Sequence, residues 1–305
     1  MKRINILNSF TLKLIAMVTM AFDHIGVTIM TLWGLSASHP AIMTLRVLGR
    51  IAMPLYCFML VEGVIHTRSY KKYALKLGIM AILISSFLAV TYYVPQLKQY
   101  NLAGFGNIFL DLLLGSLMIF TLRHKNNYIK LIAIVPLAIS ILSFSVKCYE
   151  YSMSCHQAGC DYGITISWYP KYLRLQYDWL SLALMLGYFL SYYGAKLYYK
   201  IREESYGISE EIVEGTNEMR IATNLIAVFF TLFFAFAYYL FKYFNESIVW
   251  WNANLQIGMI LAIIPIALYS GARGYNKKWF NIFSYLYYPV HIILIVGICY
   301  LIYIV

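Results

Sequence analysis

Long apolar runs dominate this chain and constrain its fold more than any other feature. We count nine runs of spanning length, at about 12–34, 42–66, 73–94, 105–122, 128–147, 176–199, 221–244, 252–270 and 280–305. In lipid every backbone polar group must be satisfied within its own segment, so runs of this length are expected to be helices. The sequence therefore predicts an all-α, polytopic integral membrane helical bundle of about nine transmembrane helices.

The charged residues support a membrane protein and indicate its orientation. Only 12% of the 305 residues are charged, which leaves no room for a large soluble domain. With the N-terminus inside, the inner segments hold seventeen Lys and Arg residues and the outer segments five. This asymmetry predicts a cytoplasmic N-terminus. No basic patch with interleaved aromatic residues lies outside the apolar runs, so nucleic-acid binding is not expected.

One inner loop divides the chain. Residues 200–220 carry six glutamates, nearly half of the acidic residues, and this charge is typical of a solvated linker. We therefore expect an N-terminal six-helix part at 1–200, an acidic cytoplasmic linker at 201–220 and a C-terminal three-helix part at 221–305. Neither an internal repeat nor a pair of Gly- or Pro-broken helices is evident, which weighs against transporter folds built from duplicated halves.

Polar residues inside the first two runs indicate a site within the membrane. Asp23 and His24 fall near the middle of 12–34, and Arg46 and Arg50 lie one helical turn apart in the next run. A charged or titratable group at such depth costs several kcal/mol and usually has a function. Asp23 and His24 are adjacent and so point about 100° apart on a helix. We therefore expect Asp23 to pair with an arginine while His24 faces a reaction cavity.

Helix rise assigns depths to further polar residues. At about 1.5 Å per residue, Asp111 falls between the levels of the two arginines, and His291 returns to the level of His24. Depth matching thus predicts one site that includes Asp111 and His291. Glu62 lies near the inner face, roughly three turns from Arg50, so these two cannot pair directly. A buried Arg–Asp pair can also serve only to fix helix contacts, and this role stays open for Arg46 with Asp111.

The sequence lacks the motifs of several kinds of site. The chain has no HExxH or CxxC pattern and its histidines are scattered singly, so no metal is expected. Serine-nucleophile signatures of the GxSxG type and phosphate-binding glycine loops are also absent. A histidine with charged neighbours remains, which suits general-base catalysis or a proton relay.

Several stretches of the chain resemble the TraX family of integral membrane proteins, whose founding member is linked to N-terminal acetylation of a conjugative pilin. They are LKLIAMVTMAFDHIG at 12–26, LRVLGRIAMPLYCFMLVEGVIHTRSYKKYALKLGI at 45–79, GNIFLDLLLGSL at 106–117 and YSGARGYNKKWFNIFSYLYYPVHIILI at 269–295. Similar proteins have a DYG-like start to the sixth helix. Either DYG at 161–163 or YDW at 177–179 corresponds here, and we favour Asp178 because it directly precedes the apolar run.

The resemblance implies a membrane acyltransferase that takes acetyl groups from acetyl-CoA, with no metal. His24 would be the general base, Arg50 would stabilise the oxyanion, and Asp23 would complete the catalytic group. The residues expected to bind substrate are Arg46, Asn107, Asp111, Asp178, His291 and Glu62. The phosphates of coenzyme A would lie on basic inner loops, at Arg68, Lys71, Lys72, Arg273 and Lys277.

The resemblance also implies a bacterial cytoplasmic membrane protein surrounded by lipid, and it leaves the acceptor open. A pilin or another exported protein, a lipid and a surface glycan all offer an amine or a hydroxyl. Intramembrane Asp, His and Arg also form proton relays, so a proton- or anion-coupled transporter is the alternative function.

Overall fold

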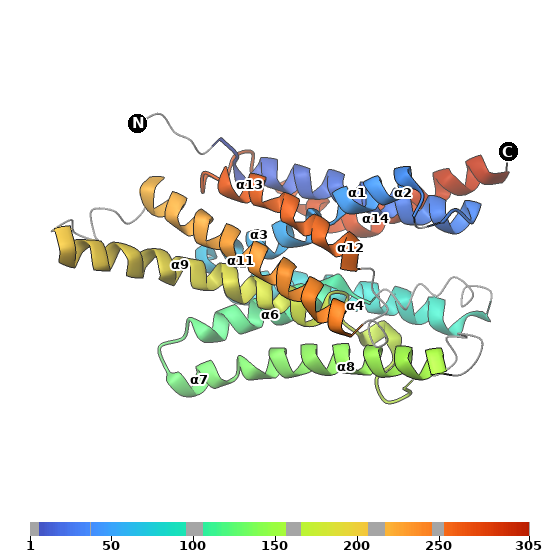
Figure 1. Ribbon diagram of the computed structural model, residues 1–305, viewed down its shortest axis with the longest axis horizontal. Coiled ribbons are helices and arrows are strands. Elements are labelled where there is room, and N and C mark those ends of the chain that lie inside the picture. Colours follow the sequence, from blue (N-terminus) through green and yellow to red (C-terminus); the bar gives the residue numbers. More distant parts are fainter. Residues whose placement is uncertain are drawn as a thin grey trace. The chain divides into compact units, whose positions relative to one another are not determined.

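The computed structural model describes residues 6–36, 38–95, 106–156, 166–206, 217–245 and 253–304. Within these ranges the regular elements are helices, and two isolated β-bridges join loop segments (Figure 1). The all-α prediction is confirmed. The elements are α1 (Ser9–Trp33), α2 (Pro40–Gly49), α3 (Ala52–His66), α4 (Tyr70–Tyr93), α6 (Ile108–Leu122), α7 (Asn127–Leu131), α8 (Ile134–His156), η2 (Lys171–Leu173), α9 (Asp178–Tyr206), α11 (Asn217–Phe244), α12 (Ala253–Gln256), η3 (Ile257–Ala262), α13 (Ile263–Ala267) and α14 (Lys278–Ile304).

Within the described ranges, six helical segments are long and apolar enough to cross a membrane. They are Ser9–Trp33, Pro40–His66, Tyr70–Tyr93, Asn127–Met153, Asn217–Phe244 and Lys278–Tyr303. The three other predicted runs are also helical, as α6, as α9 and as the α12–η3–α13 segment. The chain is therefore a multi-pass membrane protein by helix length and composition. The count of nine spans and the cytoplasmic N-terminus stay predictions.

Two compact units make up the chain. The first unit comprises Met1–Met59, Gly187–Tyr239 and Asn252–Val305, and the second comprises Leu60–Leu186 and Leu240–Trp251. The unit boundaries fall within α3, α9 and α11. Residues 207–216 of the expected acidic linker lie outside the described residues. The expected division of the chain at 200 and 220 therefore stays a prediction.

The first unit packs α1 against both α2 and α14 (Figure 1). Asn8 begins α1 by accepting a hydrogen bond from the Thr11 amide, and Gly34 ends it in the left-handed conformation, with φ of 62°. Such a C-terminal glycine has no Cβ to clash in that conformation. The unit's core includes Phe58, whose ring contacts Tyr188 and Tyr269 edge-on at 5.4 Å.

Three of the predicted spans are interrupted within the described residues. The run at 42–66 divides between α2 and α3 at Arg50 and Ile51, and the run at 128–147 divides between α7 and α8 at Ile132 and Ala133. The run at 252–270 divides into α12, the 3-10 helix η3 and α13. The expectation that no pair of broken helices exists is therefore wrong. Each interruption lies a few residues before a proline, which cannot donate the helical hydrogen bond to the residue four positions earlier. These prolines are Pro54, Pro136 and Pro265.

The second unit contains α4, α6, α7, α8, η2 and the first part of α9. Asn107 joins two of its helices: its side-chain oxygen caps α6 at the Phe109 amide, and its Nδ2 donates to the Ala81 carbonyl and the Ser85 hydroxyl. This asparagine, predicted to bind substrate, thus holds α6 against α4. A cap of this kind stabilises a helix by about 1 kcal/mol.

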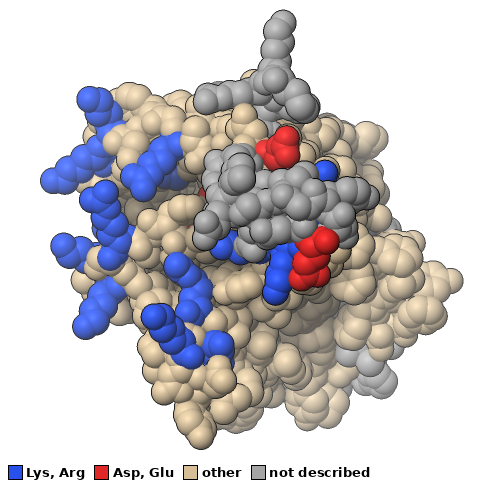
Figure 2. Space-filling view, turned by 90° about the vertical axis from the view of Figure 1, so that its left-hand side faces the viewer, with Lys and Arg blue, Asp and Glu red and all other residues tan. Residues whose placement is uncertain are grey.

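Basic side chains gather at one end of each unit. In the second unit Tyr70, at the start of α4, stacks on Phe120 near the end of α6, so the basic residues around both helix ends lie close together. In the first unit Lys13 near the start of α1 donates to Asn281 near the start of α14. Figure 2 shows a face on which Lys and Arg outnumber Asp and Glu among the described residues. This is the charge pattern expected of a cytoplasmic end.

Candidate functional site

An Asp–Arg cluster lies within the first unit. Arg50 reaches both oxygens of the Asp23 carboxylate, with Nη2 at 2.8 Å from Oδ1 and 3.0 Å from Oδ2. The Nε atom of Arg46 lies 3.6 Å from Asp23 Oδ1. All three side chains are at most 18% exposed. The sequence-based expectation that Asp23 pairs with an arginine agrees with this geometry.

Glycines bring α1 and α2 close enough to form this cluster. A Cβ added to Gly49 would lie 2.8 Å from Asp23 Cα and 2.9 Å from Asp23 N, and one added to Gly26 would lie 3.0 Å from Arg46 Cγ. Only glycine permits so short a separation between two helix backbones. Arg50 follows Gly49 directly and ends α2, donating its N–H to the Val47 carbonyl. The helix interruption therefore places the guanidinium against α1.

A histidine pair lies one residue further along α1. His24 Nδ1 is 2.7 Å from His291 Nε2, and His291 Nδ1 is 2.6 Å from the Tyr287 carbonyl oxygen. A carbonyl only accepts, so His291 Nδ1 must carry a proton, and in the neutral ring its Nε2 is an acceptor. His24 Nδ1 must then be the donor. The inferred tautomer leaves Nε2 of His24 as the basic nitrogen of a neutral imidazole.

Aromatic side chains hold this histidine pair. Tyr287 stacks on His291 with ring centroids 4.5 Å apart and an interplanar angle of 6°, and its hydroxyl donates to the Met17 carbonyl of α1. Tyr288 meets His24 edge-on at 6.0 Å. Tyr287 was not among the residues predicted from the sequence. The signal was present in its position, since a residue four before His291 shares its helix face.

Gln256 is a second residue that sequence reasoning missed. It ends α12, is only 4% exposed, and its Oε1 lies 3.5 Å from Arg50 Nη1. The signal here was an amide side chain within the apolar run at 252–270. It brings a polar group from the interrupted run at 252–270 to the arginine at the interruption of the run at 42–66.

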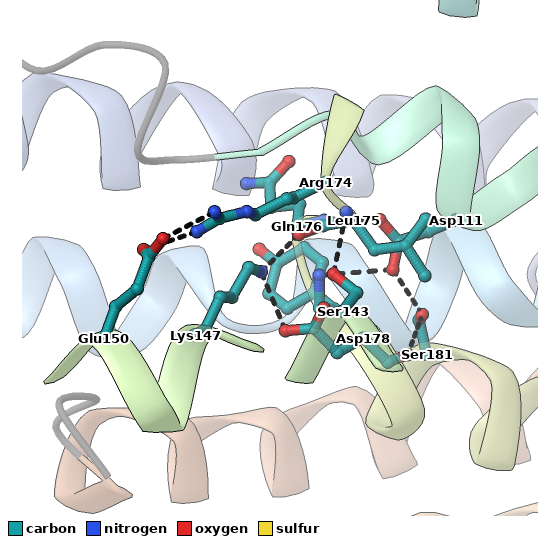
Figure 3. A network of polar contacts seen from close by, with 10 residues as sticks. Asp111, Ser143, Lys147, Glu150, Arg174, Leu175, Gln176, Asp178 and Ser181 are labelled. Carbon is teal, nitrogen blue, oxygen red and sulfur yellow. Dashed lines mark hydrogen bonds and ion pairs between the residues drawn. The ribbon is translucent and has the colours of Figure 1, made fainter. Parts of the chain in front are cut away.

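Asp111 lies in a separate network within the second unit (Figure 3). Its carboxylate accepts from the Gln176 amide at 2.6 Å, the Tyr177 amide at 3.2 Å and the Ser181 hydroxyl at 2.6 Å. Among the described residues these are its hydrogen bonds, so the expected pairing of Asp111 with an arginine is wrong. Depth along a helix says nothing about the direction in which a side chain points, and Asp111 points toward the start of α9.

The same network buries two ion pairs that the sequence did not predict (Figure 3). Lys147 lies 2.7 Å from Asp178 Oδ2 and also donates to the Leu175 carbonyl. Arg174 binds both oxygens of Glu150, at 2.6 and 2.7 Å. Asp178, predicted to bind substrate, begins α9 with φ of 53°, an unusual conformation for a residue other than glycine. The network fastens the segment before α9 onto α6 and α8. The alternative sequence position for this aspartate, in DYG at 161–163, lies outside the described residues.

The remaining predicted residues are a buried glutamate and five exposed basic side chains. Glu62 is buried on α3, with Oε2 3.6 Å from His66 Nδ1. The predicted phosphate-binding residues are exposed; Arg68, Lys71 and Lys72 belong to the second unit, and Arg273 and Lys277 to the first. No group of three His, Cys, Asp or Glu side chains that could hold a metal occurs within the described ranges.

Comparison with known proteins finds a family that is similar to the first part of the chain. The model of the family described as TraX protein matches residues 9–156, slightly less than half of the chain. Over these residues the chain is similar to the TraX family. The matched part contains α1 to α8, and so includes Asp23, His24, Arg46 and Arg50. His291 and Gln256 lie outside it.

Two curated proteins are similar to parts of this chain. One, described as a probable fimbrial assembly protein FimC, serogroup H1, from Dichelobacter nodosus, is 28% identical over 160 residues, or 52% of this chain and 57% of that protein. An uncharacterized protein of Rickettsia prowazekii (strain Madrid E) is 24% identical over 175 residues, or 57% of this chain and 52% of that protein. The chain thus spans about half the length of these relatives. No solved structure gives a significant match.

Proposed function

We propose that this membrane protein, which is similar to the TraX family over residues 9–156, is an acyltransferase that moves an acetyl group from acetyl-CoA to an amine or hydroxyl acceptor. The observation that carries the proposal is the histidine pair, in which the Tyr287 carbonyl and His291 set the tautomer of His24. That tautomer leaves Nε2 as the basic nitrogen of His24, which follows Asp23 of the Asp23–Arg50 ion pair along α1. A neutral imidazole in this state suits a general base near pH 7.

Each of these groups has a role in the proposed reaction. His24 Nε2 takes the proton of the acceptor N–H or O–H as the acceptor atom attacks the thioester carbonyl carbon. Arg50 stabilises the negative charge that develops on the carbonyl oxygen, while Asp23 holds the guanidinium in place. The carbon–sulfur bond then breaks, and the coenzyme A thiolate takes the proton back from His24. The products are the acetylated acceptor and coenzyme A.

The proposal also states where acetyl-CoA binds and which class of molecule accepts the acetyl group. The exposed basic residues before α14, Arg273 and Lys277, belong to the same unit as His24 and would contact the phosphates of coenzyme A from the cytoplasm, as substrate binders rather than catalysts. Asn107, Asp111, Asp178 and Glu62 would act on substrate only indirectly. The similarity to a fimbrial assembly protein favours an exported, pilin-like protein as acceptor, over a lipid or a surface glycan. The membrane would then be the bacterial cytoplasmic membrane.

Acetyl transfer by the purified protein tests the proposal. The full chain in lipid nanodiscs is incubated with acetyl-CoA and hydroxylamine, a small acceptor, and release of free coenzyme A thiol is measured. His24→Ala should lower the rate by about 10²–10⁴, the usual contribution of a general base. His124→Ala, at an exposed histidine after α6, is the matched control and should keep the wild-type rate. A folded His24→Ala protein with near-normal rate would contradict the mechanism.

Two of the interrupted helices favour a second candidate, a proton- or anion-coupled transporter. Broken membrane helices often form ion and substrate sites in transporters, and Arg50 and Gln256 lie at the interruptions of the runs at 42–66 and 252–270. Proteoliposomes loaded with a pH-sensitive dye separate the two candidates. Proton flux driven by an anion gradient without acetyl-CoA, and abolished in His24→Ala, would favour transport; acetyl transfer without such flux would favour the enzyme.

A further inference from the structure

The Gln256 amide has a fixed orientation. Its nearest charged neighbour, Arg50, offers N–H donors and no acceptor, so the atom that faces Nη1 at 3.5 Å must be Oε1. The Nε2 donors therefore point elsewhere. Among the described residues their hydrogen-bond partner is the sulfur of Met259, at 3.9 Å. A thioether sulfur is a weak acceptor, so this amide donor is poorly satisfied.

The weak hydrogen bond of the Gln256 amide is informative because the side chain is buried. Gln256 is 4% exposed and Met259 is fully buried, so neither is in contact with bulk solvent. Buried amide donors almost always have a good acceptor, and an exception calls for an explanation such as a ligand. The donor stands beside Arg50, whose guanidinium is fixed through two bonds to Asp23. Two neighbouring groups thus offer N–H donors from two interrupted helices.

Backbone packing keeps these two groups together. A Cβ added to Gly258 would lie 2.6 Å from the Val47 carbonyl oxygen, so η3 approaches the last turn of α2 as closely as a glycine allows. Gln256 precedes Gly258 by two residues, and Arg50 follows Val47 by three. The spacing between the amide and the guanidinium is therefore set by backbone contact rather than by flexible side chains. Preorganised donors of this kind stabilise charge that develops in a reaction.

We infer that Gln256 is a substrate-binding catalytic residue: its Nε2 donates, together with Arg50, to the carbonyl oxygen of the acyl thioester. The inference rests on the proposed acyltransferase function and adds a second oxyanion donor to it. The ligand it specifies is a thioester carbonyl, whose oxygen gains negative charge when the acceptor attacks. No proton transfer is assigned to Gln256.

Steady-state acetyl transfer with three variants tests the inference in nanodiscs. Gln256→Met has nearly the same shape but no donor, and kcat should fall about 10²–10³-fold, as when one oxyanion donor is removed, with little change in KM for acetyl-CoA. Gln256→Glu replaces the donor by a carboxylate that pairs with Arg50, so its kcat should fall at least as far. Met259→Leu removes the sulfur contact alone and is the control, with unchanged kcat. Thermal unfolding midpoints are measured for each variant.

A spectroscopic measurement separates this inference from the proposed function. In His24→Ala protein, bound acetyl-CoA labelled with carbon-13 at the carbonyl should show a lowered carbonyl stretching frequency, and adding Gln256→Met should partly reverse that shift. Unchanged kcat and an unchanged carbonyl frequency in Gln256→Met would overturn the inference while leaving the acyltransferase intact. Acetyl-CoA that binds with the shifted carbonyl but is never transferred would contradict the proposed function and support the donor. Failure to bind acetyl-CoA would overturn both.

Discussion

Gly49→Ala is a sharp test of how the Asp23–Arg50 pair is built. The new methyl carbon would lie 2.8 Å from Asp23 Cα and 2.9 Å from Asp23 N, whereas non-bonded carbon atoms prefer about 3.5–4.0 Å. Asp23 Cβ would lie closer still, so the backbones of α1 and α2 must separate by at least roughly 0.7–1 Å. Arg50 now lies 2.8 and 3.0 Å from the two Asp23 oxygens, so the same separation takes both contacts beyond normal hydrogen-bond length.

The expected cost of this substitution appears in two measurements. Overpacking of a close helix contact costs about 1–3 kcal/mol, which should lower the unfolding midpoint in detergent. A misplacement of about 1 Å at a reacting group can lower the rate about 10²-fold, which should appear in the coenzyme A release assay. Both effects follow from backbone contact and not from loss of any polar atom.

Gly297→Ala provides the matched control on α14. A Cβ there meets nothing within 4 Å, and replacing a mid-helix glycine by alanine stabilises a helix by about 0.5–1 kcal/mol. This variant should keep its activity and lose no stability. If Gly49→Ala retained wild-type activity and unfolding midpoint, the account of how glycine positions the ion pair would be refuted.

Three further predictions concern charge and orientation. Arg50→Lys keeps the positive charge but loses the planar fork that holds both carboxylate oxygens, and the rate of acetyl transfer should fall at least tenfold. Lys147→Met leaves the buried Asp178 carboxylate without its cation and should destabilise the protein by about 3–5 kcal/mol in detergent unfolding, whereas adding Asp178→Asn should recover most of that loss. Cysteines introduced at 150–170 should react with an impermeant reagent applied outside intact cells, and those at 203–215 should not; the opposite pattern would reverse the orientation.

Sequence alone determined the fold class and, within the candidate site, Asp23, His24 and the pairing of Asp23 with an arginine. Apolar runs of spanning length require helices, because an unpaired backbone group in lipid is too costly. Asp23 and His24 were identifiable because polar groups at such depth are rarely tolerated without a role. The partnership of Asp23 with an arginine also followed, since a buried carboxylate needs a cation nearby.

Helix rise predicts how deep a residue lies along a helix but not the direction in which its side chain points. This explains why Asp111 was wrongly expected to pair with an arginine. Asp111 has the depth of the arginines but points to the Gln176 and Tyr177 amides before α9. The second unit's ion pair between Lys147 and Asp178 was missed for the same reason, because its members come from different helices. Which face a residue presents, and to which neighbour, depends on how helices pack.

Tertiary structure decided the two features on which the proposed chemistry depends. The sequence contained the glycines and prolines around the helix interruptions at 42–66 and 252–270. Only the packing showed that Gly49 and Gly258 are points of close backbone contact that bring Arg50 and Gln256 together. The tautomer of His24 likewise depends on His291, 267 residues away along the chain. Local sequence fixes which groups are polar and how deep they lie, whereas hydrogen-bond direction between distant helices exists only once the backbones are packed.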